Sequence, residues 1–373
     1  MGVVRFEQIA RECRESYKGS LQGKPIVGLE HIEPYDMLLK NYDVDVETTF
    51  TKSFKKGQIL FGRRRAYQHK ACVATIDGIC SGDITVIEPI KGAVYPDLLP
   101  FIIQNDNFFE HAIKGSNGAL SPRVKWEHMA NYEVKLPSID EQRKLAEKLW
   151  AAYEVKQSYL KMIEATQEMV KSQFIEMFGS PDKTKQLSDF IEASFPGEWG
   201  EEDKDGTGVK VIRTTNFTNE GKLNLADVVT RKIDTSKVEK KKLRKGDIIL
   251  ERSGGTNENP VGRVVYYDVD GTYLFNNFTQ LLRCKDEVCP LFIFYSLYNY
   301  YQTNKSVIRS MGNKTTGIQN LKMDNYWKIP IADVSYESQN SFATIYKQAD
   351  KSEFELRKSI DAIDAVIKSL ING

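Results

Sequence analysis

The sequence predicts an α+β protein in which two mixed α/β domains are separated by two long helices. The helices are expected to pair as an antiparallel coiled coil with pseudo-twofold symmetry. Two observations predict this arrangement. A repeat of low sequence identity relates the two halves of the 373-residue chain, and each half passes through a proline into a long helical pattern. A repeat period of about 190 residues is too long for a solenoid, so it indicates a duplicated domain.

Short matching segments carry the repeat. FEQIA (Phe6–Ala10) matches LSDFI (Leu187–Ile191), and KKGQILF (Lys55–Phe61) matches RKGDIIL (Arg244–Leu250), 189 residues further on. Each half then has a polar, loop-like segment, GSNGALSPRVKW (115–126) or MGNKTTGIQNLK (311–322). The sequence therefore predicts a first domain, a first long helix, a second domain and a second long helix, at residues 1–139, 140–180, 181–336 and 337–373.

The domains themselves have mixed patterns. GDITVIEPI (82–90) and VGRVVYYD (261–268) are rich in β-branched and aromatic residues and bounded by turn residues, which is typical of strands. LLPFIIQNDNFFEHAI (98–113) and LFIFYSLYNYYQTN (291–304) indicate short helices packed by aromatic side chains.

Proline and glycine usage predicts the long helices. LPSIDEQRKLAEKLW (136–150) and IPIADVSYESQNSFATIY (329–346) make the same strand–proline–helix transition, with Pro137 and Pro330 193 residues apart. Neither proline nor glycine interrupts residues 140–178, enough for a helix of roughly 60 Å, before FGSP (178–181) ends it.

Helices this long with a narrow apolar stripe most simply pair with each other. Because a domain lies between them, antiparallel pairing would put the domains at opposite ends of the pair. The alternative is that each helix packs on its own domain over part of its length. Apolar residues at a period of about 3.5–3.6 are the expected seam: Leu145, Leu149, Ile163, Val170, Phe174, Ile345, Leu356, Ile360, Ile363 and Ile367.

Charge is balanced overall and segregated locally. The net charge of +1, from 52 basic and 51 acidic residues, argues mildly against a free-standing DNA-binding domain. However, residues 55–70 hold six basic residues and no acid, and residues 237–252 hold seven basic residues against three acids. Such clusters at matching places indicate a polyanion-binding face in each half. Ordinary solvated faces are the alternative.

Cations bind phosphates, whereas Arg, Lys, Asn, Gln and Ser at a groove edge read bases. Candidates lie in loops next to glycines that permit close backbone approach, although each could also be an ordinary loop side chain. In the first half they are Arg63, Arg64, Arg65, Tyr67, Gln68, Lys70, Lys114, Ser116, Asn117 and Arg123. In the second half they are Arg252, Ser253, Thr256, Asn276, Asn277, Arg309, Asn313, Lys314 and Thr315.

No catalytic or metal motif is convincing. The four histidines lack metal-ligand spacing, no phosphate-binding loop is present, and the five cysteines include no CxxC, which indicates reduced thiols in the cytoplasm. No apolar run is long enough to cross a membrane, and no secretory signal is found. Pro181-Asp182 with Glu202–Lys204 formally has the spacing of a magnesium nuclease, but Pro181 already serves as a helix stop and Glu202–Lys204 is expected in a loop.

The order of these features resembles the specificity (S) subunits of type I restriction–modification systems. The matching segments are KKGQILFGRRRAYQHKACVATIDGICSGDITVIEP, RKGDIILERSGGTNENPVGRVVYYD, and LPSIDEQRKLAEKL leading to MVKSQFIEMFG. The likeness covers essentially the whole chain. It departs at IPIADVSYESQNS, which is longer and keeps only Gln339 of the Glu-Gln pair, so the start of the second helix is less well defined.

The resemblance implies a non-catalytic DNA-binding subunit with two target recognition domains. Each would read one half of a bipartite, asymmetric site in double-stranded DNA, and the helix pair would set the spacer. The chain itself would bind no cofactor and no metal. Two methylation subunits would bring S-adenosylmethionine, and up to two restriction subunits would bring ATP and magnesium.

Two other readings stay open. The chain could be the DNA-recognition part of a type IIB-like restriction enzyme, or a nuclease using Asp182 and Glu202, and cleavage by the purified chain alone would indicate this. It could instead be a protein-only coiled-coil scaffold, in which case DNA affinity would be absent or insensitive to salt.

Overall fold

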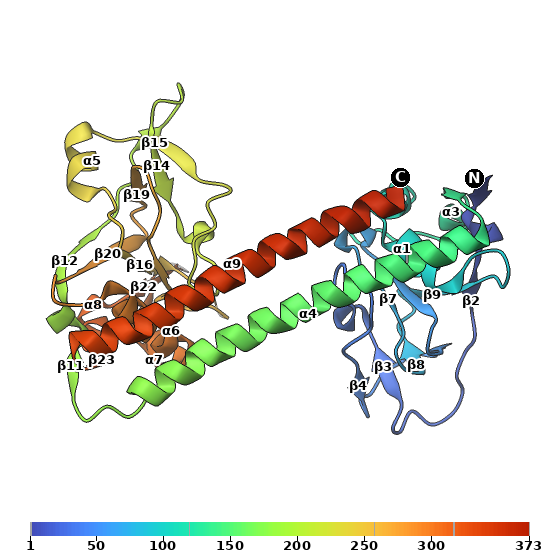
Figure 1. The fold of residues 1–373 in the computed structure, drawn as a ribbon, viewed down its shortest axis with the longest axis horizontal. Helices are drawn as coiled ribbons and strands as arrows, with labels where there is room; N and C mark the ends of the chain where they lie inside the picture. Colours follow the sequence, from blue (N-terminus) through green and yellow to red (C-terminus); the bar gives the residue numbers. More distant parts are fainter. Residues whose placement is uncertain (1, 119, 257, 316–317, 373) are drawn as a thin grey trace. The chain divides into compact units, whose positions relative to one another are not determined.

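The computed structural model describes residues 2–118, 120–256, 258–315 and 318–372 (Figure 1). The side chains of Lys314, Thr315 and Ile318 are not described. The chain divides into two compact units. Unit 1 comprises Met1–Lys161 and Leu356–Gly373, and unit 2 comprises Met162–Glu355.

Unit 1 is built from three small sheets. An antiparallel pair joins β1 (Gly2–Arg5) and β10 (Glu133–Leu136). The second sheet is antiparallel, in the order β2 (Ala10–Cys13), β9 (Ile84–Pro89), β6 (Ile59–Gly62), β7 (Ala71–Val73). The third sheet, whose β3–β8 pair is parallel, has the order β4 (Asp43–Val44), β3 (Pro25–Val27), β8 (Gly78–Cys80), β5 (Lys52–Phe54).

Short helices connect and cover these strands. The α-helices are α1 (Leu99–Gln104), α2 (Asp106–Lys114) and α3 (Trp126–Ala130). Single 3-10 turns lie at η1 (Phe6–Gln8), η2 (Leu29–His31), η3 (Ala66–Gln68) and η4 (Pro96–Leu98). The strand predicted at residues 82–90 and the helices predicted at residues 98–113 are confirmed.

Unit 2 has matching sheets. An antiparallel pair joins β11 (Thr184–Gln186) and β23 (Pro330–Ala332). An antiparallel sheet has the order β12 (Ile191–Pro196), β20 (Thr279–Cys284), β16 (Ile248–Glu251), β18 (Val264–Tyr266). The next sheet, with β14–β19 parallel, has the order β13 (Glu201–Glu202), β15 (Val229–Lys232), β14 (Val209–Ile212), β19 (Tyr273–Phe275).

A further sheet in unit 2 has the order β17 (Ser253–Gly254), β22 (Ile318–Leu321), β21 (Gly312–Thr315). The helices are α5 (Thr235–Lys241), α6 (Pro290–Thr303), α7 (Lys305–Ser310) and α8 (Met323–Tyr326), with 3-10 turns η5 (Leu187–Phe190) and η6 (Thr214–Asn216). Glu202 therefore lies in the short strand β13, and the loop expected there is wrong at that residue.

The two units share one topology, as the sequence repeat predicts. Strands β2, β9, β6 and β7 have the same order and directions as β12, β20, β16 and β18. The single parallel pair also recurs, as β3–β8 and β14–β19. The units differ at the edges of the sheet that contains the parallel pair, where unit 1 adds β5 beside β8 and unit 2 adds β13 beside β15.

The two long helices are α4 (Ile139–Phe178) and α9 (Tyr336–Asn372), of 40 and 37 residues. In unit 1 the N-terminal part of α4 meets the C-terminal part of α9, where Lys156 Nζ lies 2.6 and 2.9 Å from the carboxylate oxygens of Asp364. In unit 2 the opposite ends meet, and Gln167 Nε2 donates to Glu353 Oε1 at 3.2 Å. The helices therefore pair antiparallel, as predicted.

Both ends of the helix pair are built into aromatic and aliphatic cores. In unit 1, Leu149 and Tyr153 of α4 join the buried cluster around Phe108, and Ile367 and Leu370 of α9 pack against it. In unit 2, residues of α4, α6 and α9 form a continuous ring cluster. Its centroid distances include 5.1 Å for Phe174–Phe342, 4.9 Å for Phe174–Tyr295 and 4.9 Å for Phe178–Phe292.

Every expected seam residue is at least half-buried. Leu149, Ile163, Val170, Phe174 and Ile360 are buried. The half-buried ones are Leu145, Ile345, Leu356, Ile363 and Ile367. Some of them, such as Leu149 and Phe174, pack into a domain core, so the alternative of helix-on-domain packing describes part of each helix. Which of these residues form the seam stays a prediction.

One buried glutamine in each unit explains the repeated entry into a long helix. Gln142 Nε2 donates to Pro137 O at 3.0 Å, while its Oε1 accepts the N–H of Tyr95 at 2.9 Å. Gln339 Nε2 donates to Val334 O at 3.1 Å, and its Oε1 accepts the N–H of Cys289 at 2.9 Å. Each glutamine thus fixes the start of a long helix to the residue that caps a shorter one, η4 or α6.

The glutamines correct one sequence alignment. They place Val334, not Pro330, at the position of Pro137, so matching the two prolines is wrong by four residues. Pro330 instead begins β23, opposite Gln186 at a two-stranded edge. Proline is tolerated there because a first strand residue does not need its N–H for the ladder.

Gln142→Ala and Gln339→Ala are each expected to lower the free energy of unfolding by about 1–3 kcal/mol, because each leaves two partly or fully buried backbone groups without their side-chain partner. Urea unfolding followed by circular dichroism measures this. Gln348→Ala, at an exposed site on α9, is the control. Losses no larger than that of the control would contradict the structural role.

Candidate nucleic-acid interface

In unit 1 the chain after β6 meets the loop after α2. Isolated antiparallel bridges join Arg64 to Arg123 and Asn117 to Arg123. The N–H of Val124 donates to Arg63 O at 2.9 Å and extends this pairing. Four predicted residues, Arg63, Arg64, Asn117 and Arg123, are thereby brought together on one small surface.

Asp83 lies at the centre of this surface. Its Oδ1 accepts from Arg123 Nε at 2.7 Å, and its Oδ2 accepts from Arg123 Nη2 at 3.3 Å and Arg64 Nη1 at 3.4 Å. Arg64 Nε also donates to Ser121 Oγ at 2.5 Å. Burial acts to raise the pKa of Asp83, but hydrogen bonds and charge from Arg123 and Arg64 outweigh it and hold that pKa below its ordinary value. The ionised carboxylate therefore orients both guanidinium groups.

The turn η3 presents an aromatic side chain beside this cluster. Arg65 and His69, at φ 56° and 52°, flank the turn in the left-handed region. The N–H of Arg65 donates to Pro122 O at 2.8 Å, which ties the turn to the same loop. Tyr67 on the turn is 53% exposed, so its ring is available for contact.

Other candidates in unit 1 are less free for a ligand. Lys70 Nζ donates to Leu29 O at 2.7 Å, and Ser116 Oγ donates to Ala112 O at 2.9 Å. Both contacts support local structure. Gln68 is half-buried in η3, whereas Lys114 is exposed at the end of α2.

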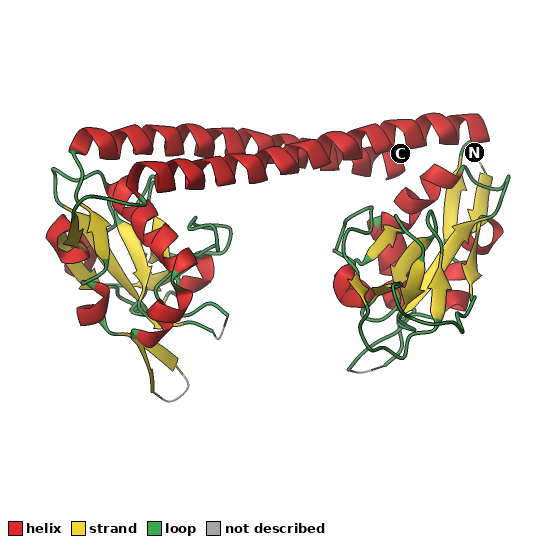
Figure 2. Ribbon diagram, turned by 90° about the horizontal axis from the view of Figure 1, so that it is seen from below, coloured by secondary structure: helices red, strands yellow, loops and turns green. Residues whose placement is uncertain are grey.

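Unit 2 builds the corresponding surface from the β17–β22–β21 sheet. Ser253 pairs with Asn320 in the strand register, and Asn320 pairs with Asn313. Ser253 Oγ donates to Asn320 Oδ1 at 2.7 Å, and Arg252 Nη1 donates to Gln280 Oε1 at 3.4 Å. The β21–β22 hairpin projects from the side of its own unit that faces away from the long helices (Figure 2).

The remaining candidates of unit 2 are dispersed. Thr256 and Asn277 are exposed, and Arg309 is exposed on α7. Asn276 is only 5% exposed, and among the described residues its Oδ1 is buried without a hydrogen-bond partner. Lys314 and Thr315 lie in β21, but their side chains fall outside the described part of the structure.

Sequence reasoning missed Asp83, Ser121 and Asn320, and also Phe278, whose carbonyl accepts the N–H groups of Arg252 and Ser253 at 2.9 Å. A search for cations and amides passes over an acid such as Asp83, although that acid organises the arginines. Asn320 lies within the loop already singled out at residues 311–322, and its register with Asn313 was the missing information. Strand register of this kind does not follow from composition.

Much of the second basic cluster is paired with acids. Lys241 Nζ lies 2.8 Å from Glu198 Oε1, and Lys245 Nζ lies 2.8 Å from Asp270 Oδ1. Lys242, the residue after α5, has its Nζ 2.7 Å from Oε2 of Glu239, which lies in α5. The local excess of positive charge at residues 237–252 is therefore smaller than the sequence suggests.

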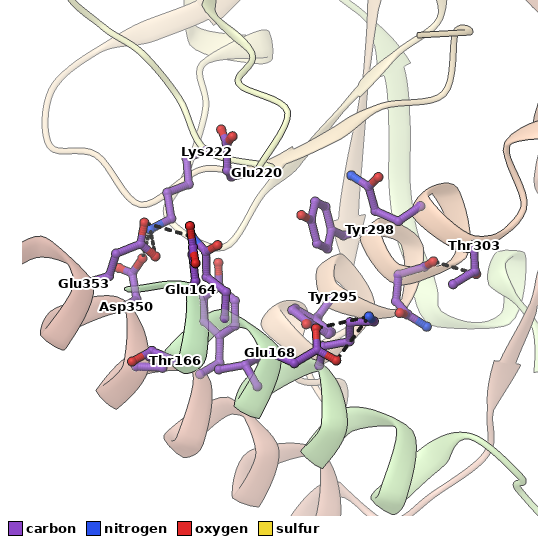
Figure 3. A pocket seen from close by; sticks show the side chains of 17 residues that line it. Glu164, Thr166, Glu168, Glu220, Lys222, Tyr295, Tyr298, Thr303, Asp350 and Glu353 are labelled. Atoms are coloured by element: carbon purple, nitrogen blue, oxygen red, sulfur yellow. Dashed lines mark hydrogen bonds and ion pairs between the residues drawn. The ribbon is translucent and has the colours of Figure 1, made fainter. Parts of the chain in front are cut away.

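Unit 2 also contains a cavity of about 400 Å3 between α4, α6 and α9 (Figure 3). Lys222 Nζ reaches across it to Asp350 at 2.7 Å and Glu353 at 3.0 Å. Burial acts to lower the pKa of Lys222, but these two carboxylates outweigh it and raise the pKa. The lining holds five acids against two lysines, which does not suit a polyanion. The Lys222 contact anchors α9 to the Lys222 turn.

The described residues hold few other candidate sites. Among them, no group of three or more His, Cys, Asp or Glu side chains could hold a metal ion. None of the described helices is both long and apolar enough to cross a membrane. All five cysteines are buried and form no disulfide. Burial raises the pKa of Cys80 to about 12, so its thiol is a poor nucleophile.

Comparison with known proteins defines the class. Residues 181–363 match the family model described as the type I restriction modification DNA specificity domain. The chain is 24% identical over 151 residues to the type I restriction enzyme EcoDI specificity subunit of Escherichia coli. This alignment covers 39% of the chain and 33% of the relative, so it spans only a third of that protein's length.

Two solved structures share the fold over nearly the whole chain. The S subunit of a type I restriction–modification system from M. genitalium aligns at a TM-score of 0.60 and 12% identity, over 99% of this chain and 94% of that one. A chain from a study of complex assembly and conformational transition of the type I R-M system aligns at a TM-score of 0.55 and 14% identity, over 100% and 96%. Residues 181–363 therefore carry a type I restriction modification DNA specificity domain, and the whole chain has the fold of the solved S subunit.

The lowered pKa of Asp83 predicts a pH-dependent loss in Asp83→Asn. A carboxylate with a lowered folded-state pKa contributes stability above its unfolded pKa and loses it as pH falls through the folded value. We expect the variant to be about 1 kcal/mol less stable than the parent at pH 7, with the difference shrinking as pH falls below the ordinary pKa of an aspartate. Urea unfolding at pH 7 and at a pH below that pKa tests this against Asp361→Asn, an exposed site on α9. A pH-independent difference would contradict the prediction.

Proposed function

We propose that this chain is the non-catalytic DNA-reading subunit of a type I restriction–modification complex. Residues 1–139 and 181–336 would be target recognition domains, each reading one half of a bipartite, asymmetric site in double-stranded DNA. Residues 140–180 and 337–373 would be the connecting helices that set the spacer. The chain would need no cofactor of its own, because the chemistry would belong to its partners.

One observation carries the proposal. Both units place a strand extension beside the segment that follows a helix, as Arg64 beside Arg123 and as Ser253 beside Asn320. Arginine and asparagine make the strong bidentate contacts to base edges, and backbone strands position them rigidly. A surface repeated in this way, with different side chains in each copy, suits two half-sites of different sequence.

Exposed apolar side chains on α4 support a partner-binding role. On the unit 2 part of α4, Met162, Met169 and Ile175 are 52%, 47% and 48% exposed, and the first two are seven residues apart on one helix face. Val155, on the unit 1 part of α4, is 44% exposed. A stripe of this kind marks a protein-binding surface. We assign it to two methylation subunits carrying S-adenosylmethionine for adenine N6 methylation. Up to two restriction subunits, which use ATP and magnesium, would bind to the complex through the methylation subunits.

Two other functions lead to different observations. A type IIB-like enzyme or a nuclease would cut DNA as the purified chain with Mg²⁺, and Asp182→Ala would abolish cutting. A protein-only scaffold would show no DNA affinity in complex with its partners, or an affinity that does not fall with salt. Asp182 and Glu202 are both exposed and lie in a connection and a two-residue strand, which does not favour a built nuclease centre.

A map of N6-methyladenine across the source genome tests the proposal directly. Deleting the gene is expected to abolish methylation at one motif made of two short half-sites around a fixed gap, and reintroducing the gene should restore it. The methylation subunit must be expressed in both strains. An unchanged methylation map under those conditions would refute the DNA-reading role.

The spacer should follow helix length. Removing seven residues from α4 near Lys161 and seven from α9 near Leu356 should shorten the gap by about three base pairs, because seven helical residues span about 10 Å and a base pair about 3.4 Å. Removing seven residues from α4 alone disturbs the pairing and is the control. Methylation at the original spacing by the doubly shortened chain would contradict this prediction.

A further inference from the structure

The two units use one backbone arrangement to hold different chemistry. In unit 1 the N–H of Arg63 donates to Asp83 O at 2.9 Å, and in unit 2 the N–H of Arg252 donates to Phe278 O at the same distance. Asp83 immediately precedes β9, and Phe278 immediately precedes β20, its counterpart. Asp83 and Phe278 therefore occupy equivalent positions.

The residues next to them are equivalent as well. Arg64 follows Arg63 and bridges to Arg123, whereas Ser253 follows Arg252 and pairs with Asn320. In unit 1 these positions hold two arginines around the carboxylate of Asp83. In unit 2 the three equivalent residues, Ser253, Asn320 and Phe278, are uncharged.

The arginines of unit 1 are held but not buried. Asp83 engages the Nε and Nη2 of Arg123 and the Nη1 of Arg64, and Ser121 engages the Nε of Arg64. The side chain of Arg123 is nevertheless 46% exposed, and that of Arg64 is 39% exposed. An arginine fixed along one edge can offer its remaining N–H groups in a plane, with less side-chain entropy to lose on binding.

Guanine is the base that fits such donors. Its major-groove edge carries two acceptors, O6 and N7, and bidentate arginine is their commonest partner. A carboxylate on its own would favour cytosine, whose N4 amino group donates. Asp83, however, already accepts from both arginines.

Unit 2 offers different groups at the same place. Ser253 is only 8% exposed and donates its hydroxyl to Asn320, while the ring of Phe278 is 42% exposed. Unit 2 thus has the amide of Asn320 and the ring of Phe278 where unit 1 has the arginine pair and its carboxylate. It therefore lacks the paired donors that would select guanine.

We propose that Arg64 and Arg123 read guanine in the half-site bound by unit 1, and that Asp83 is the positioning residue that orients them. This inference rests on the proposed function, because it presumes that each unit reads one half-site. The equivalent position of unit 2 makes no such guanine contact. The asymmetry of the target thus begins with the exchange of Arg64, Asp83 and Arg123 for Ser253, Phe278 and Asn320.

Selection from a library of random DNA duplexes tests the proposal. The full chain in complex with its methylation subunits is used as the parent and as Asp83→Asn, Arg64→Lys and Arg123→Lys, and bound DNA is sequenced. Lysine keeps the positive charge but cannot make the bidentate contact. Lys91→Gln, at an exposed site of unit 1, is the control for loss of charge.

The parent is expected to select guanine at one or two positions of one half-site. Each lysine variant and Asp83→Asn should reduce that preference about tenfold and leave the other half-site unchanged. The unchanged half-site also reports that the variants are folded. Lys91→Gln should keep the guanine preference of the parent.

Three outcomes would overturn the inference. If the parent selects no bipartite motif, the proposed function fails and this inference fails with it. If the parent selects a bipartite motif but the three variants keep its guanine preference, or neither half-site contains guanine, only the inference fails. A uniform loss of affinity over all sequences would make the arginines phosphate contacts and would also refute it.

Discussion

Burial of both ends of the helix pair is the constraint on which the rest of the structure depends. Phe174 and Phe342 meet in the core of unit 2, and Leu149 and Ile367 belong to the core region of unit 1. A helix of about 40 residues with a narrow apolar stripe gains most of its stability from such packing. Each domain is thereby joined to its helices through a packed core as well as through the chain, and the buried Gln142 and Gln339 fix where each helix starts.

Duplication of one domain has kept the backbone and changed the chemistry. Strand order and the single parallel pair are the same in both units. In contrast, the position of Asp83 is taken by Phe278, and that of Arg64 by Ser253. Because backbone hydrogen bonds hold these positions, side chains there can be exchanged without disturbing the strands. Surfaces of this kind separate the requirements of folding from those of recognition.

The sequence predicts the parts that depend on periodicity and on chain breakers. The absence of proline and glycine from residues 140–178 was enough to predict α4, and the matching segments around Lys55 and Arg244 were enough to predict a shared topology. Contacts between segments far apart in the chain are harder to predict from the sequence. Asp83 touches arginines 19 and 40 positions away, and β23 takes up Pro330, which the alignment had assigned to the helix entry. Both depend on strand register, which side-chain type does not reveal.

The division of the chain between the two units also bears on its synthesis. Unit 2 is one continuous segment, Met162–Glu355, whereas unit 1 includes Leu356–Gly373. The side chains of Ile367, Leu370 and Ile371 that pack on the core of unit 1 are therefore synthesised after the whole of unit 2. At about 5–20 residues per second, the 194 residues between Lys161 and Leu356 take roughly 10–40 s to translate. Unit 1 is thus completed only after unit 2, and in that interval its apolar surface for α9 is open to chaperones.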